Sequence, residues 1–476
     1  MKSPIFGPFY VSPSPNVAYQ RCINLIPEVV ETKTGKEVGA LYGTPGLTLF
    51  ATVGSGPIRG MLVNGGRLYV VSGRTLYGLA PLTNAVTTYG SLTTGAGPVS
   101  IIGNGTQTVV FDGVSALGTP NAAGPAAAVA LPGTGPSSAA YQDGFGVVNQ
   151  SGSNEWFQSD LLDLLTWQAL NFASASANPD DVLAIAQIRR EMFLLKEGHT
   201  EVWVNVGTTG FVFQRIDGVH IEIGIIAAAS VVIIGETLMW LGRNSQGQGI
   251  VVECTGFNPK RVSTHAIETM IAAWPDMTDA VAYGVQVRGH VLYVISSSSG
   301  DQTFVYDATT SQLAGIPMWH EWASFSGGLF SRHAGNAHAL FNGKQIIGDY
   351  QNGNLYTLDF TNLTDNGAQR KWLRSWRALA KPSEQPTRFS SLRIDMQTGI
   401  GVPDGTNPQC MLRWSDDGGH TWSSERFGAV GPPGATAKRV KFNRLGSTRR
   451  NTGLDRIFEL SSTDQFPPVI IGAEVE

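Results

Sequence analysis

Short runs of alternating apolar and polar residues, separated by glycine-containing turns, recur along most of this chain. The pattern is clearest at residues 64–72 (NGGRLYVVS), and it returns at 288–296 (RGHVLYVIS) and, in shorter form, at 351–358 (QNGNLYTL). Glycine adopts positive φ without steric cost, and aromatic and β-branched residues favour strands. Each segment therefore predicts a tight turn that leads into a β-strand.

Between residues 57 and 369 the predicted strands group into sets of four. The first set is expected at 58–63, 67–72, 75–79 and 86–89, and later sets begin near residues 99, 139, 182, 230, 281 and 338. A repeat of about 40–50 residues is typical of propeller blades. We therefore predict an irregular β-propeller with six or seven blades, and a large β-sandwich is the alternative. Helical periodicity is confined to 159–165 and 264–273.

The two ends of the chain differ from this middle part. Residues 1–56 are rich in Pro and Gly and lack sustained periodicity, so we expect an extended N-terminal arm that packs on other elements. From residue 370 a basic and aromatic segment (RKWLRSWR) leads into alternating strands at 389–396, 409–414, 439–443, 456–461 and 469–475. Residues 370–476 are thus predicted to form a smaller antiparallel β-domain, and the fold class is all-β.

Composition and charge point to a globular protein with specialised surfaces. Hydrophobic residues make up 42% of the chain and charged residues only 15%, against about 25% in typical soluble domains. Residues 370–476 hold 16 Lys and Arg and 11 Asp and Glu, a net charge of +5, whereas residues 1–369 hold 17 and 26, a net of −9. This asymmetry suggests separate faces for separate partners, and an uneven scatter of solvated charges is the alternative.

The cysteines and the apolar segments carry information about the compartment. Cys22, Cys254 and Cys410 are far apart and have no CxxC or Cys/His spacing, so buried free thiols in a reducing cytoplasm are expected. No apolar h-region follows the first residues, which disfavours a signal peptide. The longest apolar run, at 223–235, is too short to span a bilayer, so no membrane insertion is expected.

The sharpest local motif lies in the C-terminal part and matches the Asp-box pattern S-x-D-x-G-x-T-W. Its residues are Ser415, Asp417, Gly419, Thr421 and Trp422. The Asp carboxylate is expected to accept backbone N–H bonds across the turn, and the Trp to pack the hairpin against the core. The motif specifies a hairpin, so a structural role is expected.

Motifs for catalysis and cofactor binding are missing from the sequence. It contains no GxxxxGK[ST] and no G-x-S-x-G, and His320-Glu321 lacks the second His of HExxH. We therefore predict no catalytic, cofactor-binding or metal-binding residues and expect that the protein is not an enzyme. A carbohydrate-binding or sialidase-like propeller that recognises host surface glycans is the alternative class.

A basic strand and loop provide the best candidate for a charged contact between subunits. On a strand, Arg439 and Lys441 would share one face, opposite Val440 and Phe442. A solvated β-face and direct phosphate binding are the other interpretations. The full candidate set is Arg439, Lys441, Arg444, Arg449, Arg450 and Arg456.

Several segments together resemble the tail hub or nozzle protein of short-tailed bacteriophages, the packaged-DNA stabilisation protein family. They are NLIPE at 24–28, KTGK at 33–36, YGTPGL at 42–47, PIRG at 57–60, IGDYQNGNLY at 347–356, TDNG at 364–367, LRWSDDGG at 412–419, RLG at 444–446 and DRIFE at 455–459. Their order covers nearly the whole chain, although residues 100–280 add little. The chain departs from the pattern at 447–453, which inserts a basic loop between RLG and DRIFE.

This resemblance implies a structural protein of the virion tail, made in the cytoplasm of the bacterial host. It implies a homo-hexameric ring below the portal and adaptor proteins, which continues the DNA channel and retains the packaged genome. Such a ring carries the tail needle or plug and the tailspikes or fibres, and duplex DNA passes through it without sequence-specific binding. The resemblance carries over no catalytic residue and no cofactor.

Overall fold

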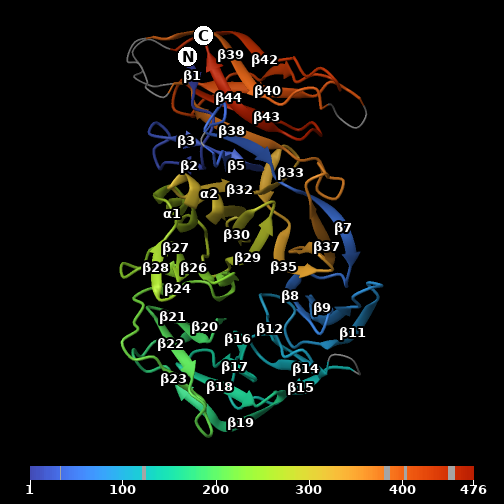
Figure 1. Ribbon diagram of the computed structural model, residues 1–476, viewed down its shortest axis with the longest axis vertical. Coiled ribbons are helices and arrows are strands. Elements are labelled where there is room, and N and C mark those ends of the chain that lie inside the picture. Colours follow the sequence, from blue (N-terminus) through green and yellow to red (C-terminus); the bar gives the residue numbers. More distant parts are fainter. Residues whose placement is uncertain (33, 121–124, 380–385, 401–404, 449–455) are drawn as a thin grey trace.

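The computed structural model describes residues 1–32, 34–120, 125–379, 386–400, 405–448 and 456–476. It is an all-β structure, as predicted (Figure 1). A propeller fills the lower and middle parts of the view, and a β-sandwich caps one end. Both chain termini lie in the sandwich, although most of the chain between them belongs to the propeller.

Sheets in the described residues form seven blades. The first four are β8 (Ile58–Asn64) to β11 (Val86–Ser91), β12 (Ser100–Gly103) to β15 (Ala127–Val129), β16 (Ala139–Gln142) to β19 (Asp163–Ser174), and β20 (Val182–Ile188) to β23 (Phe213–Arg215). The remaining three are β24 (Gly224–Ile225) to β28 (Asn258–Arg261), β29 (Val281–Val287) to β32 (Met318–Glu321), and β35 (Gly335–Phe341) to β37 (Asn354–Asp359) with β7 (Gly46–Thr52).

The innermost strands of neighbouring blades contact one another in a closed circle. The strands β8, β12, β16 and β20 each contact the next in this order. Both β20 and β29 contact the 3₁₀ turn Ala228–Ser230. The circle closes because β29 contacts β35 and β35 contacts β8. Figure 1 shows these strands around the centre of the propeller. Closure places each blade between two others, so apolar faces on both sides of a blade are covered.

Two of the three repeated hairpins form as the sequence predicts, whereas in the third Gly353 does not have positive φ and residues 350–353 form a longer connection between strands. Gly65 and Gly66 have φ of 55° and 76°, and Arg288 and Gly289, at the equivalent turn of the sixth blade, have φ of 49° and 86°. Positive φ at both central residues is the signature of the type I′ hairpin turn. The aromatic residue of each following strand is completely buried, as in Tyr69 of the first blade.

Residues 1–56 contribute strands to both parts of the molecule. β7 is the outermost strand of the seventh blade, where Leu47 lies opposite Leu358. The blade therefore joins a strand from the start of the chain to three strands near residue 350, which closes the propeller. Upstream of β7, β5 (Leu25–Val29) and β6 (Gly39–Gly43) pair with each other in the sandwich, and β1 (Lys2–Ser3) pairs with the last strand of the chain.

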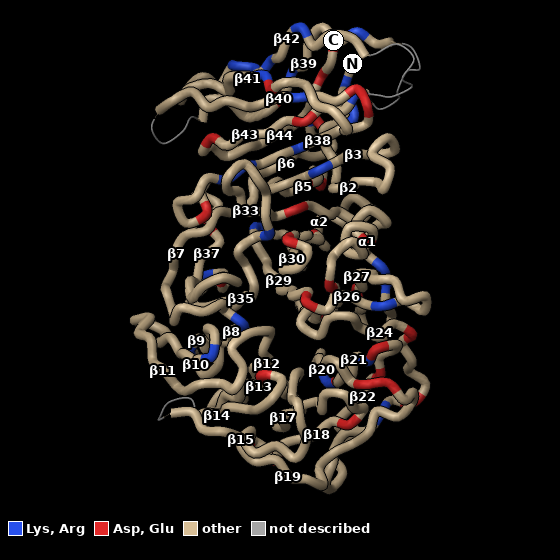
Figure 2. Tube along the Cα trace, turned by 180° about the vertical axis from the view of Figure 1, so that it is seen from behind, with Lys and Arg blue, Asp and Glu red and all other residues tan. Residues whose placement is uncertain are grey.

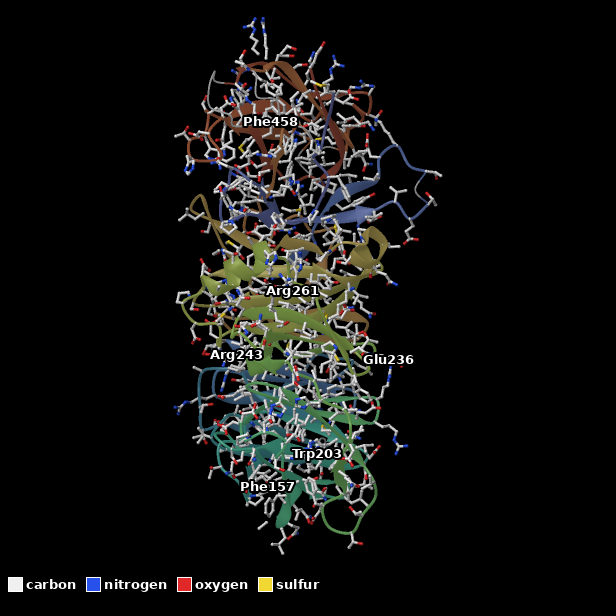
Figure 3. All side chains as sticks on the ribbon, turned by 90° about the vertical axis from the view of Figure 1, so that its left-hand side faces the viewer. Phe157, Trp203, Glu236, Arg243, Arg261 and Phe458 are labelled. Carbon is white, nitrogen blue, oxygen red and sulfur yellow. The ribbon has the colours of Figure 1, made fainter. Side chains whose placement is uncertain are left out.

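The sandwich contains two antiparallel sheets. One has the order β42-β39-β44-β6-β5, with β39 at Arg388–Met396, β42 at Val440–Ser447 and β44 at Val469–Val475. The other consists of β38 (Trp372–Arg377), β43 (Ile457–Ser462), β40 (Gln409–Ser415) and β41 (Arg426–Ala429). Apolar side chains such as Phe458, labelled in Figure 3, fill the space between the sheets.

The second sandwich sheet is continuous with the sixth blade. The short strand β4 (Cys22–Ile23) pairs with β32 on one side and with β38 on the other, so that Ile23 lies between Glu321 and Leu373. Beside this strand, the Asn24 side chain donates hydrogen bonds of 2.8 Å to Ala323 O and Lys371 O. The propeller and the sandwich therefore share one hydrogen-bonded sheet.

One of the two predicted helical segments is a helix and the other is not, and a second helix, α2 (Ala308–Ala314), was not predicted. α1 spans His265–Ala272, and the side chain of Thr264 caps it. The prediction for 159–165 is wrong, because this segment comprises the end of β18 (Glu155–Asp160), a two-residue turn and the start of β19. Leu161 and Leu162 occupy that turn and are 60% and 64% exposed. Together with the buried apolar residues on either side, they give an apolar spacing that resembles the period of a helix.

Candidate interaction surface

The Asp-box forms the turn that follows β40. Oδ1 of Asp417 accepts hydrogen bonds from Ser415 Oγ at 2.7 Å and from the backbone N–H of Thr421 at 2.8 Å, and its Oδ2 accepts from Thr421 Oγ1. Gly419 N–H donates to Ser415 Oγ at 2.8 Å, and its positive φ of 94° allows the chain to reverse. Hydrogen bonds from Thr421 and Ser415 hold the pKa of Asp417 well below its usual range.

Trp422 packs differently from the expected plug. The side chain is only half-buried, and its ring lies 5.8 Å from that of Tyr19 in the short strand β3 (Tyr19–Gln20). The guanidinium of Arg413 lies 4.7 Å from the Trp422 ring centroid. The Asp-box therefore orders a hairpin that contacts the N-terminal part of the chain.

The basic strand alternates as the sequence predicts. Arg439 and Lys441 are exposed, and Val440 and Phe442 are buried against the sandwich core. β42 lies at the edge of its sheet, where its only strand partner in the described part of the chain is β39. Arg444 is also exposed, and Figure 2 shows basic positions along this end of the molecule. These three residues are free to face a neighbouring molecule.

The other members of the candidate set lie elsewhere. Arg456 is buried, with 1% of its surface exposed, and its guanidinium donates to both carboxylate oxygens of Asp416 at 2.7 Å. Its charge is therefore neutralised inside the sandwich, so Arg456 does not belong to the candidate contact surface. Arg449 and Arg450 lie outside the described residues. Sequence reasoning missed Asp416, because the ion pair joins positions 40 residues apart.

Acidic side chains gather on the opposite part of the molecule, around the fourth and fifth blades. Glu197, Asp217, Glu222 and Glu236 are exposed there, and Figure 2 shows this cluster near β21 (Glu191–Lys196), β22 (Thr200–Asn205) and β24. Of these, Glu236 pairs with Arg189 at 2.6 Å. The unequal division of charge along the sequence thus corresponds to two separate regions of the surface.

The buried ionisable groups of the fourth blade form a structural network. Lys196 is completely buried, and its Nζ lies 2.9 Å from Asp180 Oδ1 and 3.4 Å from Glu201 Oε1. It also donates hydrogen bonds to two backbone carbonyls, which leaves no proton for chemistry. Within the described residues, no three His, Cys, Asp or Glu side chains are arranged to hold a metal ion.

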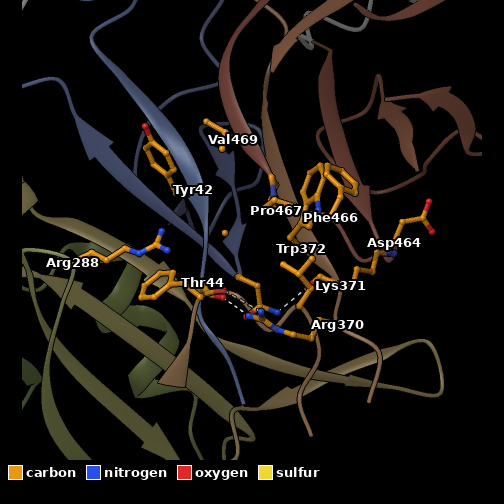
Figure 4. Close-up of a pocket in the computed structure, with 15 residues that line it drawn as sticks. Tyr42, Thr44, Arg288, Arg370, Lys371, Trp372, Asp464, Phe466, Pro467 and Val469 are labelled. Atoms are coloured by element: carbon orange, nitrogen blue, oxygen red, sulfur yellow. Dashed lines mark hydrogen bonds between the residues drawn. The ribbon is translucent and has the colours of Figure 1, made fainter. Parts of the chain in front are cut away.

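A cleft at the junction of the propeller and the sandwich was not evident in the sequence (Figure 4). Its lining residues are Asn24, Tyr42, Gly43, Thr44, Arg288, Phe360, Leu363, Arg370, Lys371, Trp372, Asp464, Phe466, Pro467, Pro468 and Val469. At its floor the Arg370 guanidinium donates to Thr44 O at 3.0 Å and to Thr44 Oγ1, bonds that Figure 4 marks with dashed lines. Arg370 also lies 3.1 Å from Asp365.

No helix in the described part of the chain has the length and apolar composition needed to cross a membrane. Cys22, Cys254 and Cys410 are buried and unpaired, and burial raises the thiol pKa of Cys22 and of Cys254 to about 11.

Comparison with known proteins gives matches to solved structures and to family models, whereas no curated protein matches. The WD40 domain of Neurospora crassa Pan2 is 8% identical, with 67% of this chain and 95% of that chain covered and a TM-score of 0.41. U3-55K is 8% identical (66% and 99% covered, TM-score 0.39), and a chain of the mitotic checkpoint complex is 9% identical (66% and 94% covered, TM-score 0.41).

Two family models together match almost the entire sequence. The model described as bacteriophage P22 Gp10, beta-propeller, matches residues 1–363, and the model described as bacteriophage P22 Gp10, beta-sandwich, matches residues 371–476. These matches agree with the two parts of the structure. The chain therefore belongs to the bacteriophage P22 Gp10 family of packaged-DNA stabilisation proteins, which are structural proteins of the phage tail.

Proposed function

We propose that this tail protein assembles into a ring, most simply a homo-hexamer, that extends the channel of the portal and adaptor proteins. The ring retains the packaged DNA and carries the needle or plug and the tailspikes or fibres. The single observation that carries the proposal is the continuous sheet from the sixth blade through β4 into the sandwich. A subunit of a channel wall must transmit load without bending, and a shared sheet resists hinge motion between its two parts.

The distribution of charge supports two roles within such a ring. Carboxylates that face the channel would repel the phosphates of duplex DNA, which lets the DNA slide without being gripped. The exposed Arg439, Lys441 and Arg444 at the sandwich end would dock on acidic surfaces of the adaptor or of a neighbouring subunit. Buried free thiols support synthesis in the reducing cytoplasm of the host before assembly.

Electron microscopy of the purified protein, alone and mixed with its adaptor, tests the ring. We expect closed rings with a central opening wide enough for a DNA duplex to pass. Single subunits in both samples would contradict the proposal. Phage particles without this protein should lose their DNA after packaging, and particles that keep it and infect normally would also contradict the proposal.

The proposed docking by the basic strand is tested with variants that remove exposed charges and leave the fold unchanged. Arg439→Ser with Lys441→Ser should weaken adaptor binding, and raising the salt concentration should weaken binding by the wild type. Arg243→Ser with Lys260→Ser is the matched control, because it removes two exposed cations from the fifth blade. Equal binding by both double variants would reject the basic strand as the docking surface.

The structure gives no support to the glycan-binding alternative at the Asp-box. A hollow there is lined by Trp414, Asp416, Asp417, Thr421, Trp422 and Ser423. Arg426 lies 5.0 Å from the Trp414 ring centroid and Arg413 lies 4.7 Å from that of Trp422. Sugar rings stack on open aromatic faces, and here arginines already lie over both indoles.

A further inference from the structure

The junction cleft places an unpaired positive charge at one end of an apolar surface. The Arg288 guanidinium carbon lies 3.9 Å from the centroid of the Phe360 ring, and the side chain is otherwise exposed. Among the described residues, no carboxylate forms an ion pair with Arg288 or Lys371. A guanidinium that stacks on an aromatic face keeps the N–H groups at its edge available for a carboxylate.

Arg288 occupies a position that local backbone preference would give to another residue. Its φ is 49°, and Gly65 holds the same position in the equivalent turn of the first blade. Glycine and asparagine adopt this conformation most readily. An arginine here therefore lowers local stability slightly, as Arg189 does at the same turn position of the fourth blade, and the Arg288 guanidinium lies against the Phe360 ring at one end of the cleft.

The middle of the cleft is apolar and contains a buried donor. Phe360, Leu363, Phe466 and Pro467 line it together with Trp372, which is 6% exposed. The indole Nε1 of Trp372 is buried, and no acceptor for it lies within the described residues. A buried N–H without a partner is unfavourable, so a ligand whose entry shifts this ring and supplies an acceptor would be favoured.

The far end of the cleft limits the ligand. Lys371 and Asp464 both line it there, as Figure 4 shows. The Lys371 ammonium lies 5.5 Å from the centroid of the Phe325 ring, and the Asp464 carboxylate accepts a hydrogen bond from the Gln409 N–H at 2.7 Å. A polyanion such as nucleic acid would meet Asp464, and a small inorganic anion would leave the apolar middle empty. The lining residues fit a bound peptide segment in which one acidic side chain stands next to an apolar side chain.

We propose that this cleft binds an extended acidic segment of a partner protein. A carboxylate of that segment binds the Arg288 guanidinium, and the apolar side chain beside it packs against Phe360 and Leu363. Both walls of the cleft would contact the segment, so binding would hold the propeller and the sandwich in their present relation. This inference goes beyond the proposed ring, because peptide binding by a single subunit does not require ring formation.

Fluorescence anisotropy with labelled peptides and the full-length protein tests this proposal. Four peptides in a Gly/Ser background contain Glu-Phe, Gln-Phe, Glu-Ala or Lys-Phe at the centre. We expect the Glu-Phe peptide to bind at least about tenfold more tightly than the others, because it alone satisfies both the charge and the apolar surface. Equal binding of all four peptides, or preference for Lys-Phe, would overturn the proposal.

Matched variants locate the binding. Arg288→Gln should weaken binding of the Glu-Phe peptide about tenfold, and Phe360→Ala should weaken it as well. Arg189→Gln is the control, because Arg189 has φ of 52° at the same position of the hairpin turn in the fourth blade. Unchanged binding by Arg288→Gln, with its melting temperature maintained, would overturn the proposal. Complete competition by phosphate or acetate at millimolar concentration would show an anion site only and overturn the peptide assignment.

Discussion

Arg456 and Asp416 form a bidentate ion pair inside the C-terminal sandwich, with both N to O distances at 2.7 Å. The Arg456 guanidinium also donates to the carbonyl oxygen of Leu445 at 2.7 Å, and its carbon lies 4.9 Å from the ring centroid of Phe389. The pair joins the Asp-box turn to the start of β43. The ion pair therefore fixes the position of the Asp-box relative to the sandwich core.

Loss of this arginine should destabilise the sandwich strongly. Arg456→Ala leaves the Asp416 carboxylate without its cation, and removing one partner of a buried pair costs about 3–5 kcal/mol. Because the Asp416 side chain is 18% exposed, we expect the lower end of that range for the free energy of unfolding. Denaturant unfolding would measure it, with Arg444→Ala as the exposed control. Equal stability of the two variants would show that the pair contributes nothing.

Closure of the propeller by β7 gives a second prediction. Leu47 and Leu49 lie two residues apart on this strand, 2% and 47% exposed. Leu47→Ala should lower the free energy of unfolding by about 2–5 kcal/mol, since it empties space between the sixth and seventh blades. Leu49→Ala should change it by less than about 1 kcal/mol. Thermal unfolding monitored by circular dichroism compares them, and a similar loss in both would argue against a closing role for β7.

Strands and turns of the propeller could be predicted because the signals that specify them are local. The predicted strands at 67–72 and 75–79 match β9 (Arg67–Ser72) and β10 (Thr75–Leu79) at both ends. An alternating strand must bury one face, and a turn with two positive φ values needs glycine or a tolerant residue within it. Both requirements involve only neighbouring positions. The alternation of Arg439 and Lys441 with buried residues was predictable for the same reason.

Pairings between distant segments could not be predicted in this way. Nothing near Ile23 indicates that β4 joins β32 to β38, because its partners are about 300 and 350 residues away. Arg456 resembles a surface cation in the sequence, and only the fold shows that Asp416 neutralises it. The cleft at Arg288 is likewise assembled from four separated stretches of the chain, at residues 24–44, 288, 360–372 and 464–469.

The Asp-box carboxylate gives a prediction about local motion. Asp417→Asn keeps the shape of the side chain but weakens its hydrogen bonds to Thr421 and Ser415, because a neutral amide oxygen is a poorer acceptor than a carboxylate. We expect faster hydrogen exchange at the amides of Gly419 and Thr421, with little change in the propeller. Glu425→Gln, which neutralises a nearby exposed carboxylate, is the control. Unchanged exchange at Thr421 in Asp417→Asn would refute this role for the carboxylate.

Stability near the junction should depend on pH through His290. Burial disfavours the charged imidazole, but the hydrogen bond from Nδ1 to Asp307, at 2.6 Å, and the carboxylates of Asp307 and Glu28 outweigh it, so the pKa of His290 is raised above 6.5. The folded state therefore holds the imidazole proton more tightly than the unfolded state. His320 nearby does not titrate in this range, since burial lowers its pKa to about 3.

The sign of the effect follows from this difference in proton binding. The stabilisation is fully present below pH 6.5, and it is lost as the pH rises through the raised pKa of His290. The melting temperature of the wild type should therefore fall between pH 6.5 and pH 9 by more than that of His290→Gln, whose amide keeps no titratable proton. Asp307→Asn should also flatten the profile, because it removes the nearest negative charge. Parallel profiles for the wild type and both variants would mean that the His290 proton does not stabilise the folded chain.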